Sequence, residues 1–325
     1  MKGLVLSITA GQGHNQTAMV ISKRFNECGV ECKYLDVYKF INPILSDSVN
    51  KIYLMSTKAI PKIYGGVYRM CEKRGVQSGA GIHGLNRITN SVLSRSLIKL
   101  IQKEKPDFII CTHIFAALLV TYISSIEHLN AKTIGVITDF TIHPYWEDSL
   151  LDYYIIANER LTIQGIKKGF PENKFLPLGI PIGTKFSRKI EKSKAKEILN
   201  LHSKHTILVM SGSMGFGAVY KEIEELDKLD MDFEIVSVSG NNKKLKTKID
   251  SMETRKKIYS YGYINNVDVF MDACDCIITK PGGLTTSEAL AKQIPMLINN
   301  PIPGQEDRNV AVSYTHLTLP TNSRV

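Results

Sequence analysis

The sequence lacks any long hydrophobic run. Among its 325 residues, no apolar stretch approaches the roughly 18 residues that a membrane-spanning helix needs. The apolar stretch near the N-terminus, Leu4–Ile8, runs directly into Gly11 and Gly13, so it is too short for a signal-peptide core. It indicates a first β-strand instead, and we expect a cytoplasmic protein.

Cysteine is scarce, and acidic residues are fewer than basic ones. The six cysteines have CxxxC and CxC spacings that match no common zinc pattern, so we expect reduced thiols and no metal site. Lys plus Arg number 41 against 31 for Asp plus Glu, which gives a formal charge of +10. Such a surplus favours anionic partners, a class that includes nucleic acid, phosphorylated ligands and acidic membrane surfaces. A hydrophobic content of 43% excludes a disordered chain.

Short apolar runs alternate with helical stretches along the chain. Polar residues bound these runs, which suits strands buried on both faces of a parallel sheet. The predicted strands are Lys2–Thr9, Cys32–Val37, Asp107–Thr112, Thr133–Thr138, Asp152–Ala157, Thr206–Ser211, Phe233–Val238, Lys257–Tyr261, Cys276–Thr279 and Pro295–Ile298. The alternation predicts an α/β protein with doubly wound sheets.

The segment Pro177–Ser187 marks the expected domain boundary. Two prolines and two glycines punctuate it, and a lysine-rich helix candidate, Lys189–Asn200, follows. We predict two Rossmann-like domains, residues 1–183 and an incomplete domain of residues 184–312. Residues 313–325 lack periodicity and resemble translated sequencing-adapter sequence. We expect this tail to be non-native and the natural C-terminus to be absent; an ordinary flexible tail is the alternative.

A first glycine motif, Ala10–His14 (AGQGH), ends the first predicted strand and opens the first helix. Gly13 lets a ligand approach the backbone, and the helix N-terminus offers free N–H groups. The pattern is not the dinucleotide-binding GxGxxG. His14 at this edge of a sheet can act as a general base near neutral pH, whereas the alternative is an N-cap or first-turn residue.

A second glycine motif, Thr279–Ala289, also follows a predicted strand and opens a helix. Its glycines permit close approach, its hydroxyls can donate hydrogen bonds, and the helix dipole favours a diphosphate. The motif lacks the GKS/T ending of a P-loop, and a glycine turn before a capped helix is the alternative. The candidate ligand contacts are Gly282, Gly283, Thr285, Thr286 and Glu288, the last toward ribose hydroxyls.

Three further loops carry polar residues at the ends of predicted strands. Pro301–Asn309 contains Gln305 and Glu306, whose amide and carboxylate groups suit sugar hydroxyls. A glycine-rich turn, Ser211–Gly217, contains the candidate ligand residues Ser213 and Met214. Thr138–Trp146 contains Asp139 and His143, which are either acceptor-side residues or only loop hydrogen-bonding groups.

The segment Ser48–Arg74 combines basic, aromatic and aliphatic residues. It holds six basic residues and one acid, interleaved with three tyrosines and several aliphatic side chains. This composition suits an anionic membrane interface. The alternative is a helix that packs on the domain with a solvated basic face.

In order, these motifs resemble the diacylglycerol glycosyltransferases related to plant monogalactosyldiacylglycerol synthase and bacterial processive diacylglycerol glucosyltransferases. The shared pattern is GxGH, TDxxxHPxW, GxPI, (S/G)GSMGxG, CDCIITKPGGxTxxEAL and PxPGQExxN, between about residues 3 and 311. The sequence departs from the pattern at Gln12 and Ser211, where the family often has glycine, and at its truncated end.

The resemblance implies a GT-B fold and an inverting, metal-independent transfer of a hexose from UDP-glucose or UDP-galactose to diacylglycerol. It implies no cofactor, a donor site in the C-terminal domain, and a lipid acceptor at the N-terminal domain. His14 is then the candidate base, with Asp139 next in line, and Gln305 and Glu306 fall where donor-sugar contacts are expected. An enzyme of this kind is peripheral on the inner face of the cell membrane.

Other functions remain open at this point. The alternatives are the peptidoglycan lipid-intermediate N-acetylglucosaminyltransferase, a UDP-sugar epimerase, and a non-catalytic protein that binds nucleotide sugar or lipid. Nucleic-acid binding is disfavoured because the basic residues are scattered and no RNA-binding motif is present.

Overall fold

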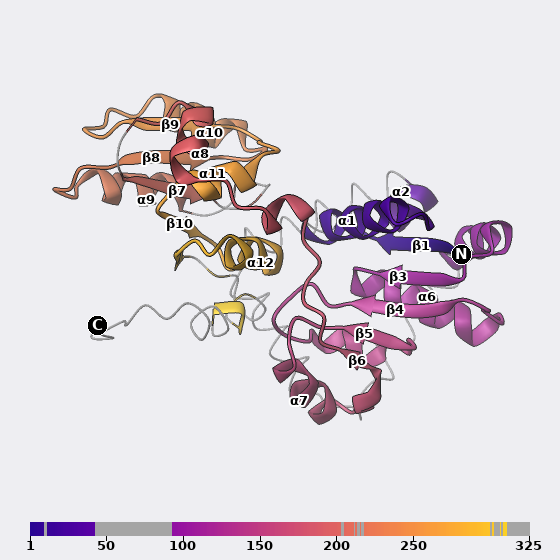
Figure 1. The fold of residues 1–325 in the computed structure, drawn as a ribbon. Helices are drawn as coiled ribbons and strands as arrows, with labels where there is room; N and C mark the ends of the chain where they lie inside the picture. Colours follow the sequence, from indigo (N-terminus) through magenta and orange to yellow (C-terminus); the bar gives the residue numbers. More distant parts are fainter. Residues whose placement is uncertain are drawn as a thin grey trace. The chain divides into compact units, whose positions relative to one another are not determined.

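The computed structural model describes residues 1–9, 12–42, 93–202, 205–210, 212, 215, 218–299, 301, 306 and 308–310. The chain divides into two compact units, of which the first runs from Met1 to Pro181 and the second begins at Ile182 (Figure 1). Four groups of predicted residues lie outside the described ones: Ser48–Arg74, Ser213 with Met214, Gln305, and the tail at 313–325.

The first unit is built on a parallel sheet of six strands in the order β2-β1-β3-β4-β5-β6. These strands are β1 (Lys2–Ser7), β2 (Glu31–Asp36), β3 (Phe108–Cys111), β4 (Lys132–Val136), β5 (Tyr153–Ile155) and β6 (Phe175–Leu176). The first five lie within the predicted runs or start one residue before them. The sequence analysis missed β6, which has only two residues.

Helices cover both faces of this sheet, which explains why the central strands β1 and β3 are nearly continuous apolar runs. Val5 and Ile110 pack with Ala18 and Ile21 of α1, whereas the alternate positions Leu4, Leu6 and Ile109 pack on the opposite face. The helical segments are α1 (Gly13–Glu27), α2 (Val37–Ile41), residues 93–104, α6 (Ile114–Ile126) and α7 (Arg160–Lys167). The short 3-10 turns are η1 (Pro144–Asp148), η2 (Glu172–Lys174) and, in the second unit, η3 (Thr184–Ser187).

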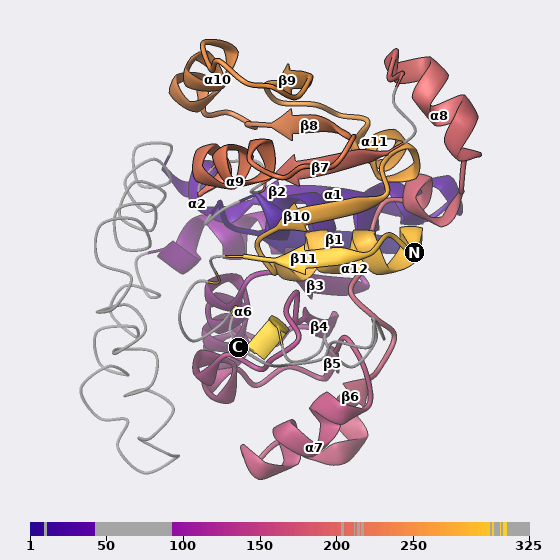
Figure 2. The same cartoon turned by 90° about the vertical axis from the view of Figure 1, so that its left-hand side faces the viewer.

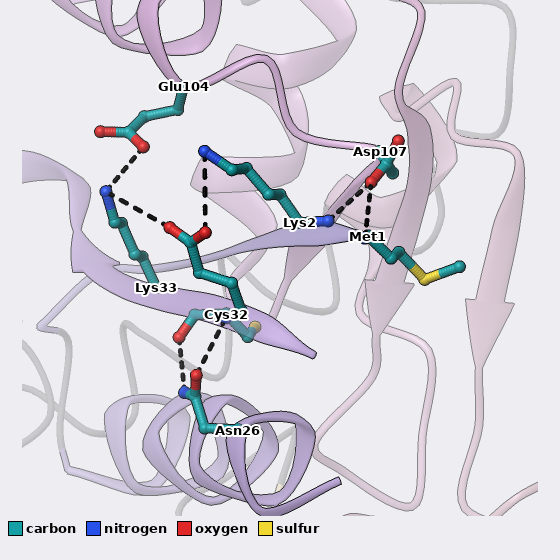
Figure 3. Close-up of polar contacts among 8 residues, drawn as sticks. Met1, Lys2, Asn26, Cys32, Lys33, Glu104 and Asp107 are labelled. Carbon is teal, nitrogen blue, oxygen red and sulfur yellow. Dashed lines mark hydrogen bonds and ion pairs between the residues drawn. The ribbon is translucent and has the colours of Figure 1, made fainter. Parts of the chain in front are cut away.

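Polar contacts tie the edge strand β2 to its neighbours (Figure 3). The side chain of Asn26 in α1 donates a hydrogen bond to the Cys32 carbonyl and accepts one from the Cys32 amide, at 2.7 and 3.1 Å. Lys33 forms an ion pair with Glu104 at 2.6 Å. Because the Lys33 side chain is half exposed, the ion pair adds little stability. The two Asn26 hydrogen bonds fix the position of β2 against α1.

The second unit has a parallel sheet of five strands in the order β11-β10-β7-β8-β9 (Figure 2). Its strands are β7 (Thr206–Met210), β8 (Glu234–Val238), β9 (Ile258–Tyr261), β10 (Cys276–Thr279) and β11 (Met296–Ile298). Its helices are α8 (Lys192–Leu199), α9 (Val219–Asp227), α10 (Lys243–Asp250), α11 (Val267–Ala273) and α12 (Gly283–Lys292). Residues of α8, α11 and α12 pack on one face and residues of α9 and α10 on the other. Both units therefore confirm the predicted α/β class with doubly wound parallel sheets.

A buried ion pair anchors the start of the second unit. Lys292 at the end of α12 lies 2.5 Å from Asp272 of α11, and both side chains are almost fully buried. The same ammonium donates to the Arg188 carbonyl, and Asp272 accepts a hydrogen bond from the Ile190 amide. This contact explains why α8 begins at Lys192, three residues later than predicted: the preceding segment is bonded to α11 and α12.

No helix within the described ranges is long and apolar enough to cross a membrane. Within the same ranges, no group of three or more His, Cys, Asp or Glu side chains is arranged to hold a metal ion.

Candidate active site

His14 lies where the first sheet reverses its strand order. β2 pairs with one side of β1 and β3 with the other, so the carboxyl ends of β1 and β3 form the topological switch point at which open α/β sheets bind ligands. Gly13 and His14 open α1, and Gln12 is its N-cap. The structure thus places His14 at the sheet edge that the sequence analysis predicted.

Two threonines hold the imidazole of His14. Its Nδ1 lies 2.9 Å from the carbonyl oxygen of Thr112 and 2.9 Å from the hydroxyl oxygen of Thr138. Since a carbonyl oxygen can only accept, the hydrogen is on Nδ1, and Nε2 keeps its lone pair. Thr112 in turn donates its hydroxyl to the His14 carbonyl at 3.0 Å. The surrounding strands therefore select the tautomer that a base acting through Nε2 requires.

Burial and the charge of Asp139 shift the pKa of His14 in opposite directions. Burial lowers its pKa, while the negative charge of Asp139 and the hydrogen bond to Thr112 raise it, and the net shift is downward. His14 is therefore neutral near pH 7, the form that can accept a proton. Asp139 is half-buried in the bend after β4, so the structure brings the two candidate catalytic residues together.

Two more histidines join His14 at this edge. The ring of His113, at the N-cap of α6, packs edge-on against His14 with a centroid distance of 4.6 Å. His143 lies near enough for its charge to lower the pKa of His113, and its own pKa is lowered to about 4, mainly by burial. Sequence reasoning named His143 but missed His113. The available signal was its place directly after the strand that ends at Cys111.

Helix α7 fixes the loop that carries Asp139 and His143. The Gln164 side chain accepts a hydrogen bond from the Ile142 amide and donates one to the Thr141 hydroxyl, both at 3.0 Å. The backbone amide of Tyr145 donates to Nδ1 of His143 at 3.2 Å. The loop after β4 is therefore a supported element with defined side-chain positions.

The second glycine motif occupies the switch point of the second sheet. β10 lies on one side of β7 and β8 on the other, and α12 begins directly after β10. Gly282 is the N-cap of α12 and supplies no side-chain cap, so the first-turn N–H groups are available to an anion. Its φ of −67° and ψ of 138° suit any residue, and a Cβ there would meet nothing within 4 Å. Neither backbone conformation nor packing requires glycine here, so the open space suits close approach by a ligand.

The side chains after this turn fall into two groups. Glu288 is half-buried, and burial raises its pKa to about 7, opposed by Lys185 and aided by Asp268. Thr285 is likewise half-buried, and Gly283 is the first helical residue. Thr286 is fully buried, and its hydroxyl has no hydrogen-bond partner among the described residues, so its contact with a ligand stays a prediction.

Residues of the loop at 301–309 contact the second glycine motif, Thr279–Ala289. Glu306 forms an ion pair with Lys280 at 3.6 Å, and both side chains are mostly buried. The buried Asn309 side chain donates to the Pro281 carbonyl at 2.8 Å. Two residues of the loop at 301–309 therefore stabilise the turn that precedes α12. Glu306 lies beside the predicted donor region and is ion-paired with Lys280 there.

Two family models match the chain along most of its length. The first, described as monogalactosyldiacylglycerol (MGDG) synthase, matches residues 14–182, and the glycosyltransferase family 28 C-terminal domain matches residues 206–310. The chain belongs to the MGDG synthase family. It is a glycosyltransferase, and the resemblance stated from the sequence motifs is confirmed.

Curated relatives of this MGDG synthase family member agree with that assignment. The processive diacylglycerol beta-glucosyltransferase of Bacillus mycoides (strain KBAB4) is 29% identical over 317 residues, covering 95% of this chain and 78% of the relative. The protein of the same name from Bacillus cereus (strain AH187) is 28% identical over 315 residues, with the same coverage.

Solved structures share the fold. Acinetobacter baumannii MurG has a TM-score of 0.58 at 14% identity, covering 95% of this chain and 82% of that one. Anabaena HepE, solved with UDP, has a TM-score of 0.55 at 13% identity, covering 96% and 89%. The predicted GT-B type of fold, with two parallel-sheet α/β domains, is confirmed.

Proposed function

We propose that this family member transfers a hexose from UDP-glucose or UDP-galactose to the hydroxyl of diacylglycerol, with inversion at the sugar carbon and without a metal ion. The names of the curated relatives and of the matching family support the acceptor and the sugar class. The observation that carries the proposal is the fixed tautomer of His14, which leaves a basic Nε2 at the switch point of the first sheet.

The first half of the reaction is proton removal. Nε2 of His14 takes the proton of the acceptor hydroxyl as the hydroxyl oxygen attacks the anomeric carbon of the donor. The nearby charge of Asp139 stabilises the imidazolium that forms, and Nδ1–H remains bonded to the Thr112 carbonyl. Attack from the face opposite the leaving group inverts the configuration.

The second half is departure of UDP. The bond between the anomeric carbon and the diphosphate oxygen breaks, and the electron pair stays on UDP. We assign stabilisation of this charge to the N-terminus of α12 at Gly282 and Gly283, where backbone N–H groups and the helix dipole meet. Thr285 adds a hydroxyl, and Glu288 accepts hydrogen bonds from the ribose.

Attachment to the inner face of the membrane is part of the proposal, because the acceptor is a bilayer lipid. The segment Ser48–Arg74 provides the basic and aromatic composition for it. Replacing Lys58, Lys62, Arg69 and Lys73 with Gln should remove most binding to phosphatidylglycerol vesicles and leave UDP binding intact. Equal co-sedimentation of this variant and wild type would reject the segment as the membrane contact.

A transfer assay tests the function. Purified protein receives radiolabelled UDP-glucose or UDP-galactose and diacylglycerol in anionic vesicles, with and without EDTA. We expect a labelled glycolipid whose yield is unaffected by EDTA and whose anomeric configuration, read by NMR, is opposite to that of the donor. Transfer of N-acetylglucosamine from its UDP derivative to a lipid-linked N-acetylmuramyl peptide, without hexose transfer to diacylglycerol, would favour the peptidoglycan alternative.

A further inference from the structure

His113 shares the switch point of the first sheet with His14. It lies two residues after the end of β3 and is the N-cap of α6, and the residue is only 6% exposed. Its ring meets the ring of His14 edge-on, at 77° between planes and 4.6 Å between centroids. The two rings are therefore in direct contact at this edge of the sheet.

The two histidines carry their hydrogens on opposite nitrogens. The backbone amide of Phe115 donates to Nδ1 of His113 at 3.1 Å, so Nδ1 is the acceptor and the neutral ring carries its hydrogen on Nε2. In His14 the hydrogen is on Nδ1 and the lone pair on Nε2. No side chain or backbone group of the described residues accepts a hydrogen bond from Nε2 of His113.

The charge state of His113 is set by the groups around it. Burial and the charges of His14 and His143 all lower its pKa well below the usual value, so the ring is neutral near pH 7 and above. A proton that arrives on His14 lowers the pKa of His113 further. His113 is therefore a donor of constant charge beside a base that titrates.

We propose that Nε2–H of His113 donates a hydrogen bond to the acceptor hydroxyl oxygen and thereby directs that hydroxyl's proton toward Nε2 of His14. The inference rests on the proposed function and adds an acceptor-binding residue to it. A hydroxyl group donates one hydrogen bond and accepts others, which matches one donor and one acceptor nitrogen on adjacent rings. During transfer the hydroxyl proton moves to His14, and His113 keeps its own.

Two substitutions of His113 distinguish the proposed donor role of its Nε2–H from the helix-capping role of its Nδ1. His113→Asn keeps an acceptor oxygen near the position of Nδ1, so it can still cap the Phe115 amide, but it has no donor at Nε2. His113→Gln places an amide N–H near Nε2 and gives up the cap. His128→Asn, at an exposed histidine of the same unit, is the matched control.

The readout is kcat/KM for diacylglycerol in the transfer assay, measured from pH 6 to 9. Loss of one neutral hydrogen bond predicts a fall of about three- to tenfold for His113→Asn, with UDP affinity and Tm unchanged. The ratio of wild type to His113→Asn should be constant with pH, and His113→Gln should recover part of the loss. Unchanged kcat/KM in His113→Asn, a ratio that varies with pH, or a His113→Gln variant as impaired as His113→Asn would each overturn the inference. Wild-type protein with no transfer to diacylglycerol would instead overturn the proposed function.

Discussion

The imidazole Nδ1 of His14 lies 2.9 Å from the carbonyl oxygen of Thr112, although 98 residues separate them in the chain. The contact forms because β1 and β3 are neighbours in the sheet and α1 starts at their shared carboxyl edge. It places the hydrogen of this first-turn histidine on Nδ1 and leaves the lone pair on Nε2, as the proposed general base requires. The sheet's strand order is therefore a direct requirement of the chemistry that we propose.

Thr138→Val should weaken the base without removing it. The substitution deletes the hydroxyl that lies 2.9 Å from Nδ1 of His14 and keeps the side chain's shape. A hydrogen bond from Nδ1–H favours the protonated ring, so its loss should lower the pKa of His14 and move the acidic limb of the pH–rate profile to lower pH. We expect kcat to fall by about three- to tenfold. Thr138→Ser, which restores the hydroxyl, should retain both the rate and the profile; an unmoved profile in Thr138→Val would contradict this role.

Gly282→Val should affect the ligand far more than the fold. Its backbone angles suit valine, and a Cβ at this position meets nothing within 4 Å, so Tm should stay near that of wild type. The added methyl groups occupy the space through which the diphosphate approaches α12. We expect UDP affinity to fall by about tenfold or more, equivalent to about 1.4 kcal/mol. Calorimetry on the Gly282→Ala and Gly282→Val pair should show a graded loss, and equal affinities would remove the diphosphate from this turn.

Glu288 should make donor binding depend on pH. Burial raises its pKa to about 7, so the free protein holds the carboxyl partly protonated at neutral pH. Ribose hydroxyls donate best to the ionised form, so UDP-glucose affinity should rise between pH 6 and 8 and binding should release protons. Calorimetry in buffers of different ionisation enthalpy measures that release. Glu288→Gln should flatten the pH dependence; a wild-type affinity that is already flat would reject the ribose contact.

Removing one charge of the buried ion pair in the second unit should lower the free energy of unfolding more than removing both charges. Lys292→Met leaves Asp272 buried without its cation, for which we expect a loss of about 3–5 kcal/mol in the free energy of unfolding. The double variant Lys292→Met with Asp272→Asn removes both charges and should recover part of that loss. Urea unfolding of wild type and the variants measures the difference. A double variant as unstable as Lys292→Met would show that the charge imbalance is not the cause.

Most strands could be predicted from the sequence because burial on both faces leaves an unmistakable apolar run. Val5 and Leu6 illustrate this, since each packs against a different layer of helices. The edge strand β6 was missed because two residues are too few to show such a pattern. The later start of α8 also escaped prediction, because the Ile190 amide is bonded to a side chain from α11 that lies far along the chain.

The candidate site, like the fold, could be predicted from the sequence only in part. Glycines and polar residues directly after strands identified His14, Asp139 and the start of α12. The contact with Thr112 could not be predicted, because the sequence does not state that β3 lies beside β1. His113 did carry a signal, its place at the end of a predicted strand, and was missed. Thr286 was assigned to the ligand because a hydroxyl near a helix N-terminus suggests a donor; the sequence did not show that this residue is fully buried.

The most direct test of the account is the initial rate of hexose transfer to diacylglycerol by His14→Ala, at saturating UDP-hexose. Removing a general base lowers the rate by about a hundredfold or more. We expect that loss together with UDP affinity and Tm near those of wild type, because the proposed diphosphate site is in the other unit and His14 is only partly buried. Transfer within a few-fold of wild type would contradict the account and would make Asp139 the first candidate for the base.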